Sequence, residues 1–221
     1  MSWADVFKIN SNIKKPINKL IQESRYNVIK VITATGTYKP SVSGLYRVIC
    51  VGKGGDSYIR ASSSNGNYVY GGGGGGVAIK DIRLDSATSY NVTVSTTASF
   101  ANQLTATAGE TLTAMPTTAG GTASGGTASG GTYNFVGEKG KYGGSTNVGA
   151  NGGSVGVVIT ELMRSNFAMD DNCVDALYGD SILNYGGGAP CMYRYRDSRY
   201  VQFNRKGLPA AVIIIPMVLE G

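Results

Sequence analysis

The sequence has no histidine, only three cysteines and a single tryptophan among its 221 residues. Without histidine, the usual Cys/His zinc sites are nearly excluded, and general acid–base chemistry lacks its commonest side chain. Cys50, Cys173 and Cys191 never sit in a CxxC spacing, so no disulfide framework is implied. Cys50 lies in "YRVICV" and is expected to be a buried small hydrophobe. We expect no metal and no cofactor.

Long apolar runs are also missing. The first twenty residues mix charges with isolated apolar positions and hold no continuous apolar run of the kind that a signal peptide needs. The longest run, "PAAVIIIPM" at 209–217, is about half the length of a membrane span and is interrupted by Pro216. We expect a protein made in the cytoplasm, without a signal peptide and without membrane insertion.

Charge is sparse and unevenly placed. The net charge is +6, yet between Ser86 and Gly137 the only charged side chain is Glu110. Basic residues gather in 1–25 and 192–206, and only the second stretch interleaves them with aromatic residues as nucleic-acid binders do. Such a binder would show strongly salt-sensitive binding. Solvated charge that keeps the chain soluble is the more general explanation, and we expect no specific nucleic-acid partner.

Glycine is abundant instead, with 33 of 221 residues, about twice the usual share of roughly 7%. Six consecutive glycines, Gly71–Gly76, precede an apolar segment, "TAGGTASGGTASGGT" spans 118–132, and "NYGGGAP" spans 184–190. Glycine-rich chains usually behave as flexible linkers, but here each run is followed by a strand-like segment. Extended, polyproline-II-like glycine runs could instead lie side by side and satisfy each other's backbone groups. We therefore expect ordered glycine segments.

From Tyr26 onward the pattern is that of strands. Short β-branched segments bounded by Gly, Pro, Asn or Ser predict strands at 28–34, 45–51, 77–84, 89–96, 155–160 and 210–217. In "VAIKDIRL" the apolar phase changes, which predicts a bulge or bend near Lys80 and Asp81. The predicted fold class is all-β: a glycine-rich β-sandwich or jelly-roll-like body over 26–221, with polyproline-II-like glycine segments.

Residues 1–25 differ from the rest. Pro16, followed by Ile17, Leu20 and Ile21 at helical spacing, predicts a short helix from about Pro16 to Glu23. The segment could pack on its own domain or anchor the chain to another protein. Its apolar residues are too few for a core and too many for a solvated tail, which favours an attachment segment. They are Trp3, Phe7, Ile9, Ile13, Ile17, Leu20 and Ile21.

A catalytic site is not expected. The only carboxylate cluster is Asp170, Asp171, Asp175 and Asp180, which would have to act as a glycosidase pair. A surface excursion with acidic side chains in solvent or at a helix start explains it better. A calcium site there would lack the fixed loop spacing of known calcium motifs.

A binding role has positive support in "CMYRYRDSRY". Five of the 14 tyrosines lie between Tyr178 and Tyr200. Tyrosine offers a flat face for stacking on sugar rings, and arginine offers a fork for phosphate or carboxylate. The alternative is a β-hairpin that buries alternate tyrosines while the arginines face water. The candidate receptor contacts are Tyr193, Arg194, Tyr195, Arg196, Arg199 and Tyr200.

The order of motifs resembles a known family. "ITATGTYKPSVSGLYRVICVGKGG", "GGGGGGVAIKDIRLDSATSYNVTVST", charge-poor glycine repeats, "GGGAP" and a closing "GLPAAVIII" resemble the glycine-rich domain of bacteriophage tail-fibre and other tail-tip, receptor-binding proteins. "MSWADVFKINSNIKKPINKLI" resembles the starts of phage tail-fibre proteins, where such a segment attaches the fibre to the tail. Two stretches depart from the pattern: "VGKGGDSYIRASSSNGNYVY" replaces a denser glycine run, and the tyrosine- and arginine-rich insert precedes the closing strand.

The resemblance implies a virion protein of the tail that is not an enzyme. As a tail fibre or adhesin it would attach the particle to a bacterial surface polysaccharide or another cell-envelope receptor. Its N-terminal segment would bind other tail or baseplate proteins, and a homo-oligomer, most simply a trimer, would cover exposed sheet edges. The alternative is a purely architectural virion component without receptor contact. The two differ in position, because an adhesin must be distal and exposed.

Overall fold

The computed structural model describes residues 29–60, 68–114, 122–143, 148–157, 163–164, 179, 181–196 and 199–219. Within these ranges all regular structure is β, in five antiparallel sheets, which confirms the all-β prediction. None of these residues forms a helix that could cross a membrane. The predicted helix Pro16–Glu23, the attachment segment 1–25 and the aspartate cluster lie outside the described residues.

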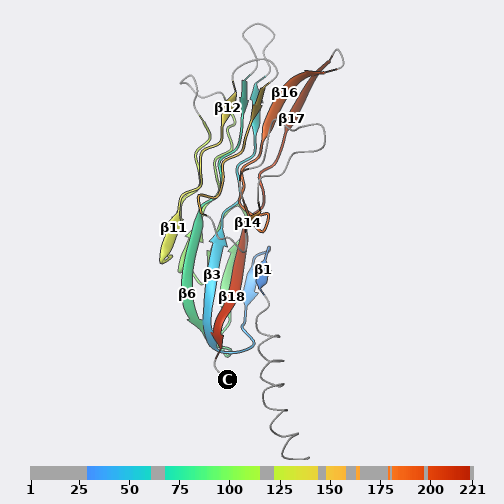
Figure 1. The fold of residues 1–221 in the computed structure, drawn as a ribbon. Coiled ribbons are helices and arrows are strands. Elements are labelled where there is room, and N and C mark those ends of the chain that lie inside the picture. Colours follow the sequence, from blue (N-terminus) through green and yellow to red (C-terminus); the bar gives the residue numbers. More distant parts are fainter. Residues whose placement is uncertain are drawn as a thin grey trace, which may run out of the picture.

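Two five-stranded sheets make the broad end of the molecule, which we call the lower tier (Figure 1). Sheet A has the order β1 (Lys30–Ile32), β18 (Ala211–Leu219), β3 (Gly44–Val51), β6 (Val77–Leu84) and β11 (Tyr133–Phe135). Sheet B has the order β10 (Ala128–Ser129), β9 (Leu104–Ala106), β8 (Ala98–Phe100), β7 (Tyr90–Val94) and β2 (Gly36–Tyr38).

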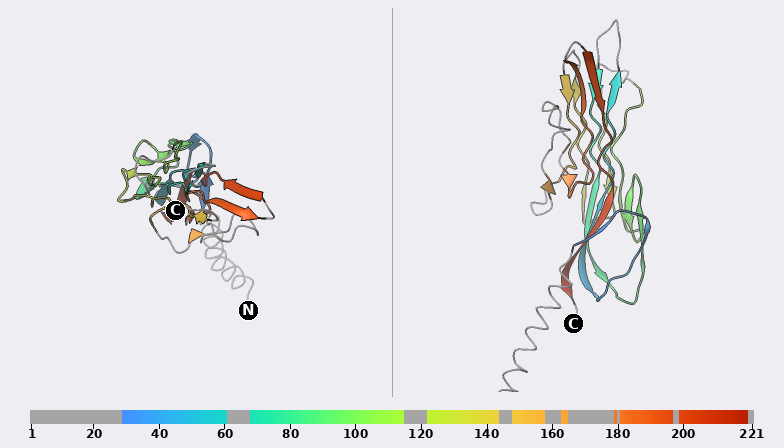
Figure 2. Two further views of the ribbon diagram at one scale, coloured as in Figure 1. Left: turned by 90° about the horizontal axis from the view of Figure 1, so that it is seen from above. Right: turned by 90° about the vertical axis from the view of Figure 1, so that its right-hand side faces the viewer.

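Smaller sheets lie further along the molecule. Sheet C has the order β12 (Tyr142–Gly143), β5 (Tyr68–Tyr70) and β4 (Tyr58–Arg60), and sheet D the order β13 (Val148–Ala150), β16 (Cys191–Arg196) and β17 (Arg199–Asn204). Both lie at the end away from the C-terminus, which we call the upper tier (Figures 1 and 2). The pair β14 (Met163–Arg164) and β15 (Ser181–Ile182) lies beside the middle of the molecule.

The main core lies between sheets A and B. One cluster of buried side chains joins Val48 and Ile214 of sheet A to Val92, Phe100 and Leu104 of sheet B. A second cluster lies on the outer face of sheet A. There Ile49, Val77, Ile79, Ala211 and Ile213 pack against Val155 and Ile182. The upper half of sheet A is therefore covered on both faces.

Coverage on both faces explains why the predicted bulge near Lys80 and Asp81 is wrong. β6 pairs with β3 without interruption from Val77↔Val51 to Leu84↔Gly44. Val77 and Ile79 belong to the outer cluster, whereas Ala78 and Leu84 belong to the core between the sheets. The apolar phase changes because the covered face changes along the strand. A register shift does occur elsewhere, in β18 between Pro216 and Val218.

The strand predicted at 155–160 is absent from the described part of that segment, residues 155–157. Residues 155–157 carry no strand, and 158–160 lie outside the described residues. Val155 is fully buried in the outer cluster on sheet A, so its apolar character serves packing rather than a ladder. Strands β3, β6, β7 and β18 lie within a few residues of the segments predicted for them.

Between the tiers, the buried segment Gly71–Gly76 is surrounded by other parts of the backbone. Each of its six amides donates a hydrogen bond of 2.7–3.1 Å to a carbonyl elsewhere in the chain, and the accepting segment repeats every third residue. Gly71 and Gly74 donate to Lys141 and Glu138, Gly72 and Gly75 to Ala189 and Gly186, and Gly73 and Gly76 to Glu110 and Thr107.

Three further segments lie against the glycines at the positions that Cβ atoms would occupy. An ideal Cβ on each of Gly71–Gly76 would lie 1.9–2.2 Å from a carbonyl oxygen. The oxygens belong to 52–55, 124–127 and 151–154, again in a repeat of three. We call Gly71–Gly76 and its six neighbouring segments the glycine bundle. No L side chain fits at its centre, which is why a folded body contains six glycines in a row.

Candidate functional site

The upper tier is held together by a small core of its own. Val69, Ala150 and Cys191 are buried together, with Ile59 packed against them. The thiol of Cys191 also donates to the carbonyl of Tyr58 at 3.3 Å. Sheet C and sheet D are thereby joined face to face, so the upper tier does not depend on β16 and β17 alone.

All six predicted receptor contacts lie on the hairpin of β16 and β17. The strands pair from Cys191↔Asn204 to Arg196↔Arg199, which shows the hairpin itself, whereas burial of its alternate tyrosines stays a prediction. In this register Tyr193, Tyr195 and Tyr200 occupy strand positions in phase with Cys191, and Arg194, Arg196 and Arg199 occupy the alternate positions. The pairing thus brings the six sequence-predicted residues together on two adjacent strands.

This hairpin extends to the end of the upper tier (Figure 1). In the view from above, β16 and β17 project sideways from the glycine bundle (Figure 2). Its inner strand, β16, pairs with β13 at Ala150↔Cys191 and Val148↔Tyr193. Among the described residues, β13 pairs only with Cys191–Tyr193, so the rest of the hairpin extends beyond this partner strand.

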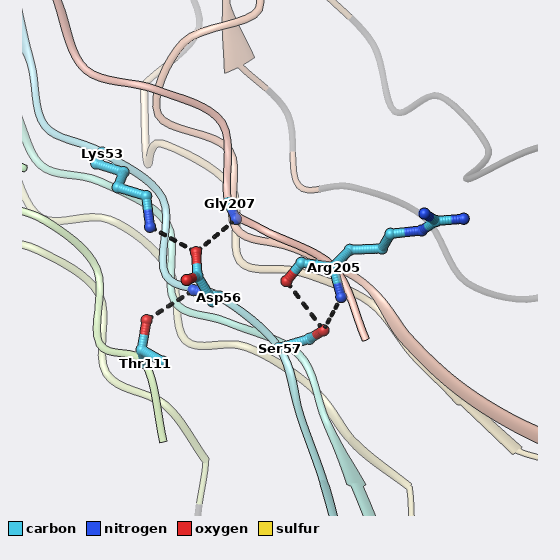
Figure 3. A network of polar contacts seen from close by, with 6 residues as sticks. All are labelled: Lys53, Asp56, Ser57, Thr111, Arg205 and Gly207. Carbon is cyan, nitrogen blue, oxygen red and sulfur yellow. Dashed lines mark hydrogen bonds and ion pairs between the residues drawn. The ribbon is translucent and has the colours of Figure 1, made fainter. Parts of the chain in front are cut away.

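A polar network fixes the base of the hairpin (Figure 3). The Asp56 carboxylate accepts a 2.9 Å hydrogen bond from the amide of Gly207 and forms an ion pair with Lys53. The Asp56 amide donates to the hydroxyl of Thr111 at 2.7 Å. The segment that leaves β17 is therefore tied to two other parts of the glycine-rich middle of the molecule.

Ser57 adds a second connection to the same segment. Its hydroxyl accepts a 2.7 Å hydrogen bond from the Arg205 amide, and its own amide donates to the Arg205 carbonyl at 3.0 Å. Ser57 is only 5% exposed, so these bonds are shielded from water. Residues 56–57 and 205–207 thus orient the hairpin relative to the bundle, a role that the sequence analysis missed.

Sheet C carries a group of tyrosines that the sequence analysis also missed. Tyr58, Tyr70 and Tyr142 are direct cross-strand partners on three adjacent strands. The rings of Tyr70 and Tyr142 lie 5.2 Å apart, and the ring of Tyr68 stacks on Tyr142 at 6.2 Å. The sequence signal that could have revealed them is the alternation of tyrosine and valine in "YVY", directly before a charge-poor glycine run. Tyr70 is buried, whereas Tyr58, Tyr68 and Tyr142 are half-buried.

Shifted pKa values occur in the lower tier. Burial raises the pKa of the Cys50 thiol to about 12. Burial and the neighbouring Tyr46 raise the pKa of Tyr38 to about 12. A hydrogen bond from Arg47 lowers the pKa of the Asp81 carboxyl. These shifts follow from packing and pairing in the body, away from the hairpin.

The upper tier contains residue types whose chemistry suits stacking and ion pairing. It combines tyrosine rings on sheet C with tyrosines and arginines on the hairpin. In the described part of the chain, no three His, Cys, Asp or Glu side chains are grouped in a way that could hold a metal ion. Cys50 and Cys191 are both buried and carry reduced thiols.

No protein-family model and no curated protein matches this chain.

Proposed function

We propose that this protein is a bacteriophage tail protein, a tail fibre or receptor-binding adhesin that attaches the particle to the bacterial cell surface. The observation that supports the proposal is that the entry of the chain and the hairpin lie at opposite ends of the molecule. The chain enters the described body at Ile29, in the lower tier, whereas the hairpin with its tyrosines and arginines ends the upper tier (Figure 1). An adhesin needs this arrangement, with attachment at one end and recognition at the other.

The glycine bundle acts as a rigid spacer between a β-sandwich and the upper tier. Hydrogen bonds that return to the same neighbour every third residue fit the polyproline II conformation, which has three residues per turn. Six residues in that conformation rise about 19 Å. Backbone hydrogen bonds on all sides resist bending, so the bundle would hold the hairpin at a fixed distance from the particle.

At the other end, the segment 1–25 binds other tail or baseplate proteins. The ligand of the hairpin is a surface polysaccharide or another cell-envelope receptor that carries phosphates or carboxylates, because tyrosines stack on sugar rings and arginines pair with anions. The protein acts in the virion tail as a homo-oligomer, with a trimer favoured. It is a binding protein and not an enzyme.

The test is adsorption to host cells of particles that carry R194A, R196A and R199A together. We expect weaker adsorption than with wild type, and wild-type adsorption that falls as salt is raised, because exposed ionic contacts are screened. The matched control removes the same charge elsewhere, at Lys39, Lys139 and Lys141, which are exposed in the lower tier and the glycine bundle. That control should adsorb normally.

Normal adsorption by a folded hairpin triple variant would overturn the assignment of the hairpin. Binding would then lie in the segment "YIRASSSNGNYVY" at 58–70, or the protein would be architectural. Electron microscopy of particles labelled on this protein separates these two. A distal label supports an adhesin, and a label buried in the tail or baseplate supports an architectural component.

A further inference from the structure

The lower half of sheet A leaves its outer face open. In the upper half, Val155 and Ile182 cover that face. In the lower half, the outer face of β3 and β6 carries Leu45, Arg47 and Asp81, and nothing from the described part of the chain covers it (Figure 1). Arg47 and Asp81 form a two-bond ion pair there at 2.8 and 2.9 Å, with side chains 41% and 39% exposed.

Exposed apolar side chains gather on this open face. The described residues expose five large apolar side chains: Ile29 (39%), Leu45 (37%), Tyr133 (60%), Val136 (61%) and Met217 (45%). Three of them, Ile29, Leu45 and Met217, lie in the lower half of sheet A or directly precede it, and by strand alternation Ile29 and Leu45 follow the phase of its outer face. Tyr133 lies opposite Ile79, in the covered half. Single exposed apolar residues need no explanation, but a group on one face marks a contact surface.

The edges of the open half are protected against strand addition. β1 pairs with β18 only at Val212–Ile214, and beyond it the edge contains Pro216, which has no amide hydrogen, at a register shift. At the opposite edge, β11 pairs only with Val77–Ile79, and the free part of β6 carries Lys80, Asp81 and Arg83. A partner must therefore lie across the face rather than extend the sheet.

The N-terminal segment enters beside this face. β1 is antiparallel to β18, with Lys30 opposite Ile214, so Ile29 lies at the level of Ile215, at the border of the open half. The eight peptide units from Ile21 to Ile29 span up to about 26 Å when extended. The open half is about 10 Å wide across β18, β3 and β6, so Ile17, Leu20 and Ile21 can reach any part of it.

We propose that residues 1–28 dock across the open lower face of sheet A, with Ile17, Leu20 and Ile21 packed on Leu45 and Met217. A segment tethered to the body is present at an effective concentration in the millimolar range, so it outcompetes a second copy of the chain for the same surface. The inference is independent of the receptor role. It adds that Ile17, Leu20 and Ile21 hold the attachment segment on the body, which leaves Trp3, Phe7, Ile9 and Ile13 to contact other tail proteins.

The experiment measures the rate of tryptic cleavage after Arg25 in the full-length chain, and compares wild type with two single variants and their double variant. Leu45→Glu on the face and Ile17→Glu on the segment should each speed cleavage by roughly tenfold, because each removes apolar contact from the docked state. The double variant should be cut no faster than either single one, since both changes break the same contact. The matched control is Thr93→Glu, at an exposed position of β7 in sheet B, which should leave the rate unchanged.

Thermal unfolding of each variant separates loss of docking from loss of the fold, and Met217→Glu provides a second face variant. Unchanged cleavage in both folded face variants would overturn the proposal. Cleavage that slows as protein concentration rises would also overturn it, because a second copy would then occupy the face.

Discussion

The carbonyl oxygen of Gly55 lies 1.9 Å from the position that a Cβ atom on Gly72 would occupy. Because the obstacle is backbone, it cannot rotate away as a flexible side chain would. Gly72→Ala should therefore lower the free energy of unfolding by about 3 kcal/mol or more, the upper range for overpacked interiors. Urea unfolding of the purified variant measures this directly.

Gly36 provides the matched control. It begins β2, and an added Cβ would meet nothing within 4 Å. Gly36→Ala should change stability by less than about 1 kcal/mol, in the stabilising direction, because alanine has less conformational freedom to lose. Equal losses in both variants would show that glycine is needed for its conformation and not for close approach.

The amides of Gly71–Gly76 should exchange slowly with solvent hydrogen. All six donate to carbonyls of other segments, so exchange requires the glycine bundle to open. We expect exchange within about tenfold of that of Val48 and Ile49 in the central strand β3, since both would need global unfolding. Peptide-level mass spectrometry can follow both regions. Rapid exchange of the glycines with protected β3 amides would contradict the bundle.

The strands of the lower tier were predictable because their side chains carry the signal. β3, β6 and β18 are β-branched and flanked by glycine or proline, and β7 alternates cleanly. The phase change in β6 was misread because one sequence cannot show that Val77 faces one cluster and Leu84 another. Coverage of both faces depends on Val155 and Ile182, which are distant in sequence.

The arrangement of the glycine bundle was beyond sequence reasoning. Glycine has no side chain that could specify a neighbour, so the pairing of Gly74 with Glu138 leaves no trace in the pattern. The hairpin residues were recognisable by their chemistry, and Arg196 pairs with Arg199 because only two residues separate β16 from β17. The tyrosines of sheet C were missed because Tyr58, Tyr70 and Tyr142 meet only through long-range strand pairing.

Asp56→Ala should destabilise the base of the hairpin. The substitution leaves the buried amide of Gly207 without its acceptor and Lys53 without its ion-pair partner. An unsatisfied buried donor costs about 1–3 kcal/mol. Asp56→Asn retains an oxygen acceptor for Gly207 and should lose less. Urea unfolding compares the two variants.

The control for this prediction is Ser129→Ala, at an exposed position on the edge strand of sheet B. It should change stability by less than about 0.5 kcal/mol, as is usual for surface sites. If Asp56→Ala were equally neutral, the network at the hairpin base would contribute nothing to stability.

Stability should fall at alkaline pH because of two groups in the lower tier. Burial raises the pKa of Cys50 from 9.0 to about 12. Burial and Tyr46 raise that of Tyr38 from 10.0 to about 12. The folded protein thus retains protons that the unfolded chain releases. Their stabilisation is complete below the unfolded pKa values and is lost as pH rises toward 12, by up to about 1.4 kcal/mol per pH unit for buried Cys50. The loss from Tyr38 is smaller, because solvent screens its half-exposed phenol.

The variants Cys50→Ala and Tyr38→Phe test this assignment, because neither replacement can ionise. Each also changes packing, and Cys50→Ala leaves a small cavity in the main core, but that loss is the same at every pH. The informative quantity is therefore the difference in unfolding free energy between about pH 8 and about pH 10.5, where the unfolded thiol and phenol are largely ionised. Each variant should show a smaller difference than wild type, and the double variant the smallest. If both retained the full wild-type difference, alkaline loss of stability would come from other groups in the chain.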